Sequence, residues 1–449
     1  MMSEEQIKSE VVLEEPGGDK EDIDVAGLKK TVFGAAIGNL IEWFDYATYG
    51  YLATVIAAVF FAPGDKTAAL LSTFAVFAVS FVVRPLGGIV WGYYGDKLGR
   101  KKILVLTVII MSLATFSIGL IPGYASIGIG APFLLLVCRL IQGFSASGEY
   151  AGAAAFIAEH APDKKRGLLV SMVPASTAAG LVLGAIVASL LEFNLSPGSL
   201  QSWGWRIPFL MSGPLGIIAL FIRLKLEDPE IFKEMEAQEK DVKEKKKSPM
   251  LQGIKSNWRQ VMAAFGVVSL NAVGFYIILT YMPTYLSEEL GFNGAASILT
   301  TILSLGSYVL FLPIVGSIAD KYGRKPVLIT ACVLFVLLTY PIFVMLSWGG
   351  AFAILAQILL GAILAGNDGV LATFLTEMFP TNVRYSCFAL SFNSSNALFG
   401  GTAPFVATFL IVTTNNTFAP AFYLMGAAIA AFIALFWTKE TANQPLRQE

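Results

Sequence analysis

The chain has 449 residues, of which 55% are hydrophobic and only 14% are charged, and its formal net charge is −1. A soluble domain of this length covers its surface with polar groups, which this composition does not supply. The composition therefore argues against a soluble enzyme and a disordered scaffold, and the near-neutral charge argues against nucleic-acid binding. At about 20 apolar residues per crossing, the chain has room for about twelve membrane-spanning helices.

The apolar runs predict an all-α membrane protein with twelve transmembrane helices in two pseudo-symmetric six-helix bundles. The runs are too long for barrel strands and lack their alternation. We place the helices near residues 31–60, 69–95, 103–122, 131–160, 167–192, 206–225, 259–287, 295–319, 326–347, 351–379, 384–412 and 418–438. The corresponding regions are an N-terminal tail (1–30), a first bundle (31–225), a charged linker (226–257), a second bundle (258–438) and a C-terminal tail (439–449).

Lysine and arginine predict the orientation, because basic residues accumulate in the cytoplasmic loops of membrane proteins. If both termini are cytoplasmic, 27 of the 31 basic residues fall on that side. Only Lys66 and Arg206 fall on the outside, and Arg84 and Arg139 lie within helices. The acidic, polar N-terminus does not resemble a signal peptide. The sequence therefore predicts a multi-pass protein with both termini in the cytoplasm.

The sequence shows no pattern typical of a metal, cofactor or nucleotide site. The three cysteines lie in apolar runs without disulfide or metal spacing, and the single His160 excludes a histidine-based metal centre. A G-x-x-x-x-G-K-[ST] phosphate loop is absent. We therefore expect no cofactor, no metal and no catalytic residue.

Two segments of the first half recur in the second half. Residues 92-GYYGDKLGRKK-102 resemble 316-GSIADKYGRKP-326 at an offset of 224. Residues 148-GEYAGAAAFIAEHAPDKKRG-167 resemble 366-GNDGVLATFLTEMFPTNVRYS-386 at an offset of 218. Two ordered matches at nearly equal offsets indicate an internal repeat. In transporters built from such repeats, the substrate site lies between the halves near the middle of the membrane.

The repeated loops predict a cytoplasmic gate. Asp96 is expected to accept hydrogen bonds or oppose a helix N-terminus across the two halves, and Arg100 to reach Glu159. Such contacts would hold the cytoplasmic side shut and break when the halves rock open. The alternative is that these charges only set topology. The candidate gate residues are Gly92, Asp96, Arg100, Glu159, Arg166, Gly316, Asp320, Arg324, Glu377 and Arg384.

Six ionisable residues lie inside predicted helices, where charge is costly and usually marks a transport pathway. Four are candidate proton-coupling carboxylates: Glu42, Asp45, Glu149 and Asp368. The other two are Arg84 and Arg139, and a buried arginine needs an anionic partner. A substrate carboxylate and a protein carboxylate could compete for Arg139. The alternative is a structural ion pair that joins the first and fourth helices, and for Arg84 a structural role is equally well supported.

Aromatic and amide side chains surround these charges and form a candidate substrate site. Aromatic rings hold quaternary ammonium groups by cation–π contacts, although most of these rings would pack in any helical core. The candidate substrate-binding residues are Arg139, Trp43, Tyr46, Tyr49, Tyr150, Asn271, Phe275, Tyr276, Asn367 and Asn393.

Several of these segments carry a family resemblance that runs from about residue 29 to residue 446. The motifs are 38-GNLIEWFDY-46, 84-RPLGG-88, 95-GDKLGRKK-102, 139-RLIQGFSASGEY-150, 203-WGWRIPF-209 and 439-KETANQPL-446. They resemble the metabolite:proton symporter family of the major facilitator superfamily. Segments 279-LTYMPTYL-286 and 378-MFPTNVRYS-386 look closest to its bacterial proline/glycine betaine branch. The resemblance implies a monomeric osmoprotectant–proton symporter in a bacterial plasma membrane, with a small-molecule substrate and protons as its partners.

Other functions stay open from the sequence alone. A proton symporter of an organic acid such as α-ketoglutarate, citrate or shikimate is the nearest alternative, and a dicarboxylate would need a second buried cation such as Arg84. A drug or cation exporter has no need of Arg139. A receptor that binds without transport has no need of matched gate loops. The sequence departs from the resemblance at Asp368 and in 171-SMVPASTAAG-180, and it stops at Glu449 without a long C-terminal coiled coil.

Overall fold

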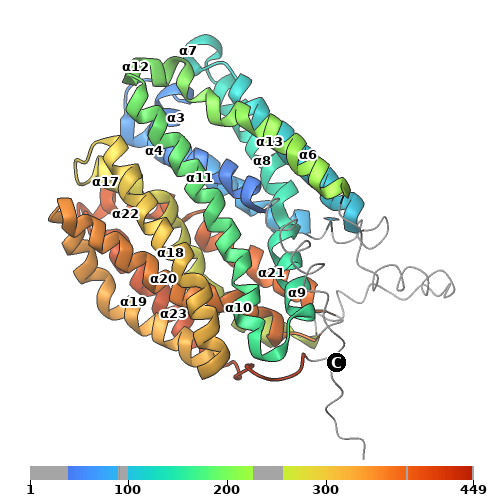
Figure 1. Ribbon diagram of the computed structural model, residues 1–449. Coiled ribbons are helices and arrows are strands. Elements are labelled where there is room, and N and C mark those ends of the chain that lie inside the picture. Colours follow the sequence, from blue (N-terminus) through green and yellow to red (C-terminus); the bar gives the residue numbers. More distant parts are fainter. Residues whose placement is uncertain (1–38, 89, 92–99, 226–255, 381–382, 447–449) are drawn as a thin grey trace, which may run out of the picture.

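The computed structural model describes residues 39–88, 90–91, 100–225, 256–380 and 383–446 (Figure 1). Every regular element in these residues is helical. Most of the predicted tails and linker, and the gate residues Gly92 and Asp96, lie outside the described residues. The side chains of Arg100, Glu149 and Glu159 lie outside them as well, so their predicted roles stay predictions.

The first bundle begins with residues 39–60, whose last part is α3 (Ala53–Phe60). It continues with α4 (Lys66–Val82), α6 (Arg100–Leu120), α7 (Tyr124–Ile127), α8 (Gly130–Ser145), η1 (Ala146–Gly148), α9 (Glu149–His160), η2 (Asp163–Lys165), α10 (Arg166–Val170), α11 (Met172–Asn194), α12 (Pro197–Ser199), η3 (Leu200–Gly204) and α13 (Arg206–Lys225). The predicted fourth helix is interrupted by the η1 turn, at the glycine before Glu149.

The second bundle has the same order of long helices. Its elements are α16 (Trp258–Phe275), η4 (Tyr276–Tyr281), α17 (Met282–Glu288), α18 (Gly294–Tyr322), α19 (Arg324–Ser347), α20 (Gly350–Met378), α21 (Arg384–Ser395), η5 (Asn396–Gly400), α22 (Ala403–Thr414) and α23 (Ala419–Leu435). The η4 and η5 segments are π-helical, a rare geometry that is frequent at functional sites.

The described residues contain nine helical segments long and apolar enough to cross a membrane. Two shorter apolar helices, Val105–Leu120 and Ala419–Leu435, and the first helix over residues 39–60 complete the predicted set. The prediction of twelve transmembrane helices in two bundles is therefore confirmed. The predicted loop at 320–325 is shorter than expected, because Gly323 alone separates α18 from α19. Its φ of 105° is readily available only to glycine.

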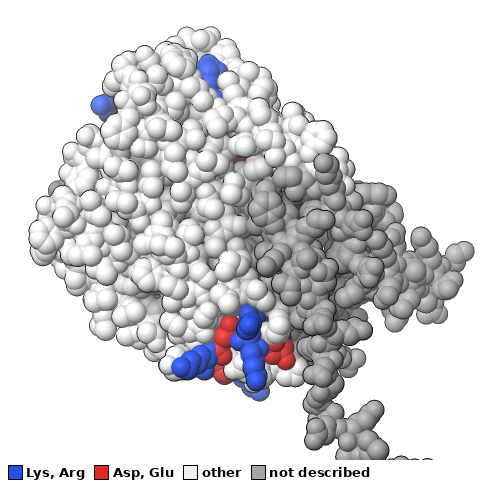
Figure 2. Space-filling model, viewed as in Figure 1, with Lys and Arg blue, Asp and Glu red and all other residues white. Residues whose placement is uncertain are grey.

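The two bundles meet along a seam formed by helices from opposite halves. Helices α11 and α18 lie side by side (Figure 1), and α4 packs against η5 and α22. One end of the molecule carries α10, the α18–α19 turn and the C-terminal segment, and we call it the charged end. Figure 2 shows charged side chains gathered there, whereas the broad middle of the same face carries almost none. This distribution suits a protein whose middle faces lipid.

Candidate functional site

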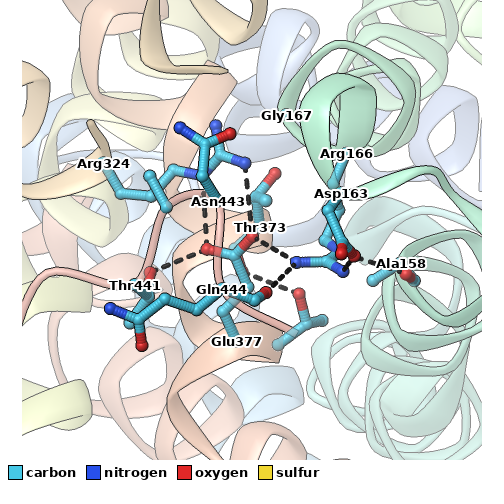
Figure 3. Close-up of polar contacts among 12 residues, drawn as sticks. Ala158, Asp163, Arg166, Gly167, Arg324, Thr373, Glu377, Thr441, Asn443 and Gln444 are labelled. Atoms are coloured by element: carbon cyan, nitrogen blue, oxygen red, sulfur yellow. Dashed lines mark hydrogen bonds and ion pairs between the residues drawn. The ribbon is translucent and has the colours of Figure 1, made fainter. Parts of the chain in front are cut away.

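At the charged end, four buried or nearly buried ionic side chains join the two halves (Figure 3). Glu377 of α20 lies 3.0 Å from Arg166 of the first bundle and 3.2 Å from Arg324 of the second. Arg324 also pairs with Asp320 at 2.8 Å, one helical turn earlier in α18. Arg166 pairs in addition with Asp163. We call Arg166, Asp320, Arg324 and Glu377 the interhalf ion cluster.

Asp320 ties α18 to the start of α10 in the other half. Its two carboxylate oxygens accept hydrogen bonds from the backbone N–H groups of Gly167 at 2.8 Å and Leu168 at 2.9 Å. A helix N-terminus carries partial positive charge, so a carboxylate at this position is favourable. This is the contact that the sequence predicts for Asp96, seen at its repeat equivalent Asp320.

The C-terminal segment crosses the same cluster. The Thr441 hydroxyl donates to Glu377 at 2.7 Å, and the Gln444 carbonyl accepts from Arg166 at 3.2 Å. Glu440 accepts hydrogen bonds from the backbone N–H groups of Arg324 and Lys325, which begin α19. Residues 440–444 therefore contact both halves, and no spacing in the sequence predicted this.

Glycines allow the two halves to touch at the cluster. A Cβ atom added to Gly316 would lie 2.6 Å from the Gly167 carbonyl oxygen. A Cβ atom added to Gly167 would likewise lie 2.6 Å from the Gly316 carbonyl oxygen. Both obstacles are backbone atoms, which cannot rotate away. Glycine at these positions therefore allows α10 and α18 to approach closely.

We expect Gly316→Ala to keep the protein folded and inserted but to lower transport at least about tenfold. The added methyl group would collide with backbone across the seam and hold the halves apart at the charged end. Initial rates of substrate uptake, normalised to the protein in the membrane, measure the effect. Gly306→Ala is the matched control on the same helix, because nothing lies within 4 Å of its added Cβ. Equal rates for both variants would contradict the importance of this contact.

The Glu440 carboxyl has a shifted pKa that makes a second prediction. Burial raises the pKa of Glu440, but backbone N–H donors of Ala442, Arg324, Lys325 and Thr441 outweigh burial and hold the pKa below its usual 4.5. The unfolded chain then binds the proton first as pH falls. The carboxylate's stabilising contribution is therefore complete near neutral pH and disappears as pH falls through the folded pKa.

At pH 7 we expect Glu440→Gln to lower the apparent Tm of the purified protein by roughly 1–3 °C, as for a lost helix cap. The difference between the variant and the wild type should shrink as pH falls below 4.5 and should approach zero once pH is below the lowered folded pKa. Differential scanning fluorimetry at several pH values measures it, with the exposed Glu288→Gln as control. A difference that grows as pH falls would contradict the assigned contact.

Of the predicted gate residues, the structure brings Arg166, Gly316, Asp320, Arg324 and Glu377 together at one place. Arg384 is buried and donates through Nε to the Thr376 carbonyl at 2.8 Å, near the end of α20. Thr441 and Gln444 were missed, because a short polar tail has no periodicity to place it.

A second layer of contacts joins the halves nearer the middle of the seam. The Asn393 amide donates to the Ser147 carbonyl at 2.9 Å, and the Tyr385 hydroxyl donates to the Gly148 carbonyl at 3.0 Å. The Tyr150 ring stacks on Phe392 with centroids 4.6 Å apart. Asn393 of the second bundle therefore contacts the η1 turn of the first.

Inside the first bundle, Arg139 is fully buried (0% exposed). Its guanidinium lies 3.6 Å from the centroid of the Tyr49 ring and donates to Gln142 at 3.1 Å. Its Nε and Nη2 atoms have no hydrogen-bond partner among the described residues. A relay leads away from it: Gln142 donates to Thr115, and the Thr115 hydroxyl contacts Asp45 at 2.8 Å. Thr115 and Gln142 were missed, although Gln142 lies three residues after Arg139 on one helix face.

Arg84 has a different partner from Arg139. It lies 3.4 Å from Glu42, and both side chains are buried. Its guanidinium also lies over the rings of Phe81 at 4.4 Å and Tyr46 at 4.6 Å. The Glu42–Arg84 ion pair therefore joins the first helix to the second. The alternative considered from sequence was a pair between the first and fourth helices.

Aromatic rings fill the seam and also close it away from the charged end. Trp43 meets Phe275 edge-on at 5.0 Å and Tyr276 at 6.2 Å. Farther along, the Tyr51 hydroxyl donates to the Leu279 carbonyl at 2.7 Å. The halves are thus in contact at the charged end, at the middle and beyond it, which is an occluded arrangement.

Asp368 of the second bundle is 3% exposed. The Tyr308 hydroxyl donates to Asp368 Oδ2, while Oδ1 has no partner among the described residues. Asn271 and Tyr150 lie beside the same carboxyl group. The amide of Asn367 is buried with neither atom paired among the described residues. Tyr308 was missed, because it lies in an otherwise apolar run.

Two six-helix bundles that meet along a charged, aromatic seam define a secondary-transporter fold of the two-bundle class. The chain belongs to the Major Facilitator Superfamily, whose family model matches residues 35–307. A second model, described as Sugar (and other) transporter, matches residues 223–448. The predicted family is therefore confirmed, and the protein is a multi-pass membrane transporter.

Curated relatives match nearly the whole chain. It is 39% identical over 436 residues to a "Proline/betaine transporter" of Salmonella typhimurium, covering 96% of this chain and 87% of the relative. It is 39% identical to the "Glycine betaine/proline/ectoine/pipecolic acid transporter OusA" of Dickeya dadantii, covering 95% and 86%. It is 36% identical to the "Ectoine/proline transporter ProP" of Corynebacterium glutamicum, covering 96% and 88%.

Solved structures share the fold at low sequence identity. A crystal structure of a D-xylose-proton symporter is 20% identical, with a TM-score of 0.72 over 93% of this chain and 99% of that one. A partially occluded inward open conformation of the xylose transporter XylE from E. coli is 20% identical, with a TM-score of 0.74 over 94% and 100%. The arrangement of the two bundles is thus that of known transporters.

Proposed function

We propose that the protein imports a small zwitterionic osmoprotectant, such as proline or glycine betaine, together with protons by alternating access. The observation that carries this proposal is the fully buried Arg139, whose guanidinium keeps unpaired donors among the described residues. Such a group is suited to bind a carboxylate. The relatives named for proline, betaine and ectoine at 36–39% identity support the substrate class.

We place the charged end in the cytoplasm of a bacterium. The excess of Lys and Arg on that side supports this orientation, and the curated relatives named above are bacterial. Both termini then lie inside the cell. The seam is contained within a single chain, so a monomer is sufficient as the transport unit.

In the proposed binding mode, the substrate carboxylate pairs with Arg139 and its methylated end contacts seam aromatics. Trp43 and Tyr276 come from opposite halves and are in ring contact, with centroids 6.2 Å apart, so a ligand that binds against this pair touches both bundles. A cation–π contact with such rings contributes about 2 kcal/mol when water is excluded. Tyr46 and Phe275 extend the same aromatic surface.

An organic dianion fits this interior less well. A dicarboxylate needs a second buried cation with free donors, and Arg84 is the candidate. Arg84 is paired with Glu42 and covered by the rings of Tyr46 and Phe81. Binding a second carboxylate there would first require breaking a buried ion pair, which costs several kcal/mol.

We propose that Asp45 carries the coupled proton. The relay from Asp45 through Thr115 and Gln142 reaches Arg139, so the charge of Asp45 is felt at the substrate anchor. Ionised Asp45 competes with the substrate carboxylate for Arg139, and protonation removes that competition. A cavity of about 10 Å³, close to the smallest that holds one water molecule, borders Asp45 and Glu42. Glu42, Glu149 and Asp368 stay as alternative carriers.

The interhalf ion cluster is proposed as the cytoplasmic gate. It joins the halves through ion pairs and helix N-terminal contacts, which can break and reform without rebuilding a packed core. Opening to the cytoplasm would separate Arg166 from Glu377 and Gly167 from Asp320. The alternative, that these charges only set topology, does not require contacts between the two halves.

Uptake of radiolabelled glycine betaine into proteoliposomes tests the proposed function. We expect an imposed inward proton gradient to drive accumulation, and an uncoupler to abolish it. An excess of unlabelled proline should compete, whereas α-ketoglutarate should not. Protein that is folded and inserted but accumulates α-ketoglutarate instead of betaine would overturn the proposed substrate in favour of an organic acid.

A further inference from the structure

We propose that Asp368 is the anionic subsite that recognises the positive pole of the substrate, and that it makes the transporter selective for zwitterions. The inference deepens the proposed function and rests on it. Its basis is the juxtaposition of a buried carboxylate oxygen without a partner and two tyrosines from opposite halves, Tyr308 and Tyr150.

The charge balance around Asp368 differs from that around the other buried acids. Glu42 lies 3.4 Å from Arg84, and Asp45 is linked to Arg139 through Thr115 and Gln142. No Lys or Arg side chain among the described residues makes an ion pair with Asp368. A carboxylate buried without an internal cation either takes up a proton or needs a cation from outside to stay ionised.

The immediate surroundings suit an alkylammonium group. Tyr308 donates to Oδ2 and so fixes the carboxyl group, while Oδ1 has no hydrogen bond among the described residues. Tyr150 lies beside the same carboxyl group, and its ring stacks on Phe392 at 4.6 Å. The carboxylate supplies the charge that an alkylammonium group needs, and aromatic rings beside it add to the attraction for a methylated ammonium group.

The subsite lies where the two halves meet. Asp368 and Tyr308 belong to α20 and α18 of the second bundle, whereas Tyr150 belongs to α9 of the first. Arg139, proposed to anchor the substrate carboxylate, belongs to α8 of the first bundle. The interior thus offers unpaired donors in one half and an unpaired acceptor in the other, and a zwitterion complements both.

Binding of two matched probes tests the inference. Glycine betaine and 3,3-dimethylbutanoate have the same shape and carboxylate, but a neutral carbon replaces the ammonium nitrogen in the second. We expect the wild-type protein to bind betaine at least about tenfold more tightly than its isostere, because only betaine pairs with Asp368. Equilibrium binding to the purified, intact protein measures both Kd values.

In Asp368→Asn we expect the Kd of betaine to rise at least about tenfold and that of the isostere to stay the same or fall, which removes the discrimination. Asp65→Asn, an exposed helix cap, is the matched control. Tyr308→Phe should show the same trend more weakly, and it keeps the test informative if Asp368→Asn fails to fold.

If Asp368→Asn still binds betaine more tightly than the isostere by the wild-type factor, the inference is overturned. If only Tyr308→Phe folds, the same result in that variant overturns it. So does an Asp368→Asn variant that keeps the wild-type Kd for betaine but loses proton-driven uptake, because Asp368 would then carry the proton. Wild-type protein that binds neither probe overturns the proposed function itself, and the inference falls with it. These outcomes distinguish the two failures.

Discussion

Glu377→Gln is expected to lower substrate uptake at least about tenfold and to open the charged end. Glu377 is the acid shared by Arg166 and Arg324, at 3.0 and 3.2 Å, and Thr441 adds a third contact. Glutamine keeps the shape but removes the charge, leaving two buried guanidinium groups short of an anion. Breaking a buried pair costs about 3 kcal/mol or more, which displaces a conformational equilibrium roughly 150-fold.

Cysteine accessibility measures the opening separately from transport. Ser171 is buried, and its hydroxyl would lie 3.0 Å from a Cβ added to Gly316, so it reports on the seam itself. We expect a cysteine placed at 171, in a background without the three native cysteines, to react with a maleimide at least about tenfold faster when Glu377→Gln is present. Glu288→Gln, an exposed acid, is the control. Unchanged labelling and uptake would contradict a gate at this cluster.

Arg139→Lys is expected to weaken glycine betaine binding roughly 10- to 150-fold, although the charge is kept. The guanidinium lies over the Tyr49 ring, 3.6 Å from its centroid, and keeps Nε and Nη2 unpaired among the described residues. Lysine cannot provide a planar pair of donors to a carboxylate, and a charge-assisted contact of this kind is worth about 1.5–3 kcal/mol.

Equilibrium binding of betaine to the purified protein distinguishes a loss of affinity from a failure of the transport cycle. The exposed Arg259→Lys is the matched control, because it makes the same substitution away from the seam. Arg84→Lys should affect stability more than the betaine Kd, since Arg84 is already paired with Glu42. A wild-type Kd in Arg139→Lys, together with a large rise in Arg84→Lys, would move the substrate anchor from Arg139 to Arg84.

The membrane fold could be predicted from the sequence because its signals are local. Each crossing needs a long apolar run, and the lipid leaves helices as the available structure. The repeat also pairs Asp96 with Asp320 in sequence, and the contact predicted for Asp96 is found at Asp320. The loop before Arg324 was predicted too long, because Asp320 and Lys321 were interpreted as loop charges rather than the last turn of α18.

The partners of the interior charges could not be predicted in the same way. Spacing shows which residues share one helix face, but not which neighbouring helix covers that face. Glu42 therefore pairs with Arg84 of the second helix, and Asp45 with Thr115 of α6. Tyr308 and the tail residue Thr441 give no pattern in sequence, because their importance depends on contacts with residues far away in the chain.

The central claim, that betaine and protons move together through the seam, is tested most directly by betaine-driven proton flux. Proteoliposomes enclose a pH-sensitive dye, with no pH gradient imposed and the membrane potential clamped by potassium and valinomycin. We predict that external glycine betaine acidifies the lumen, and that Asp45→Asn abolishes the acidification while retaining betaine exchange. Entry of betaine into wild-type proteoliposomes without acidification would contradict proton symport.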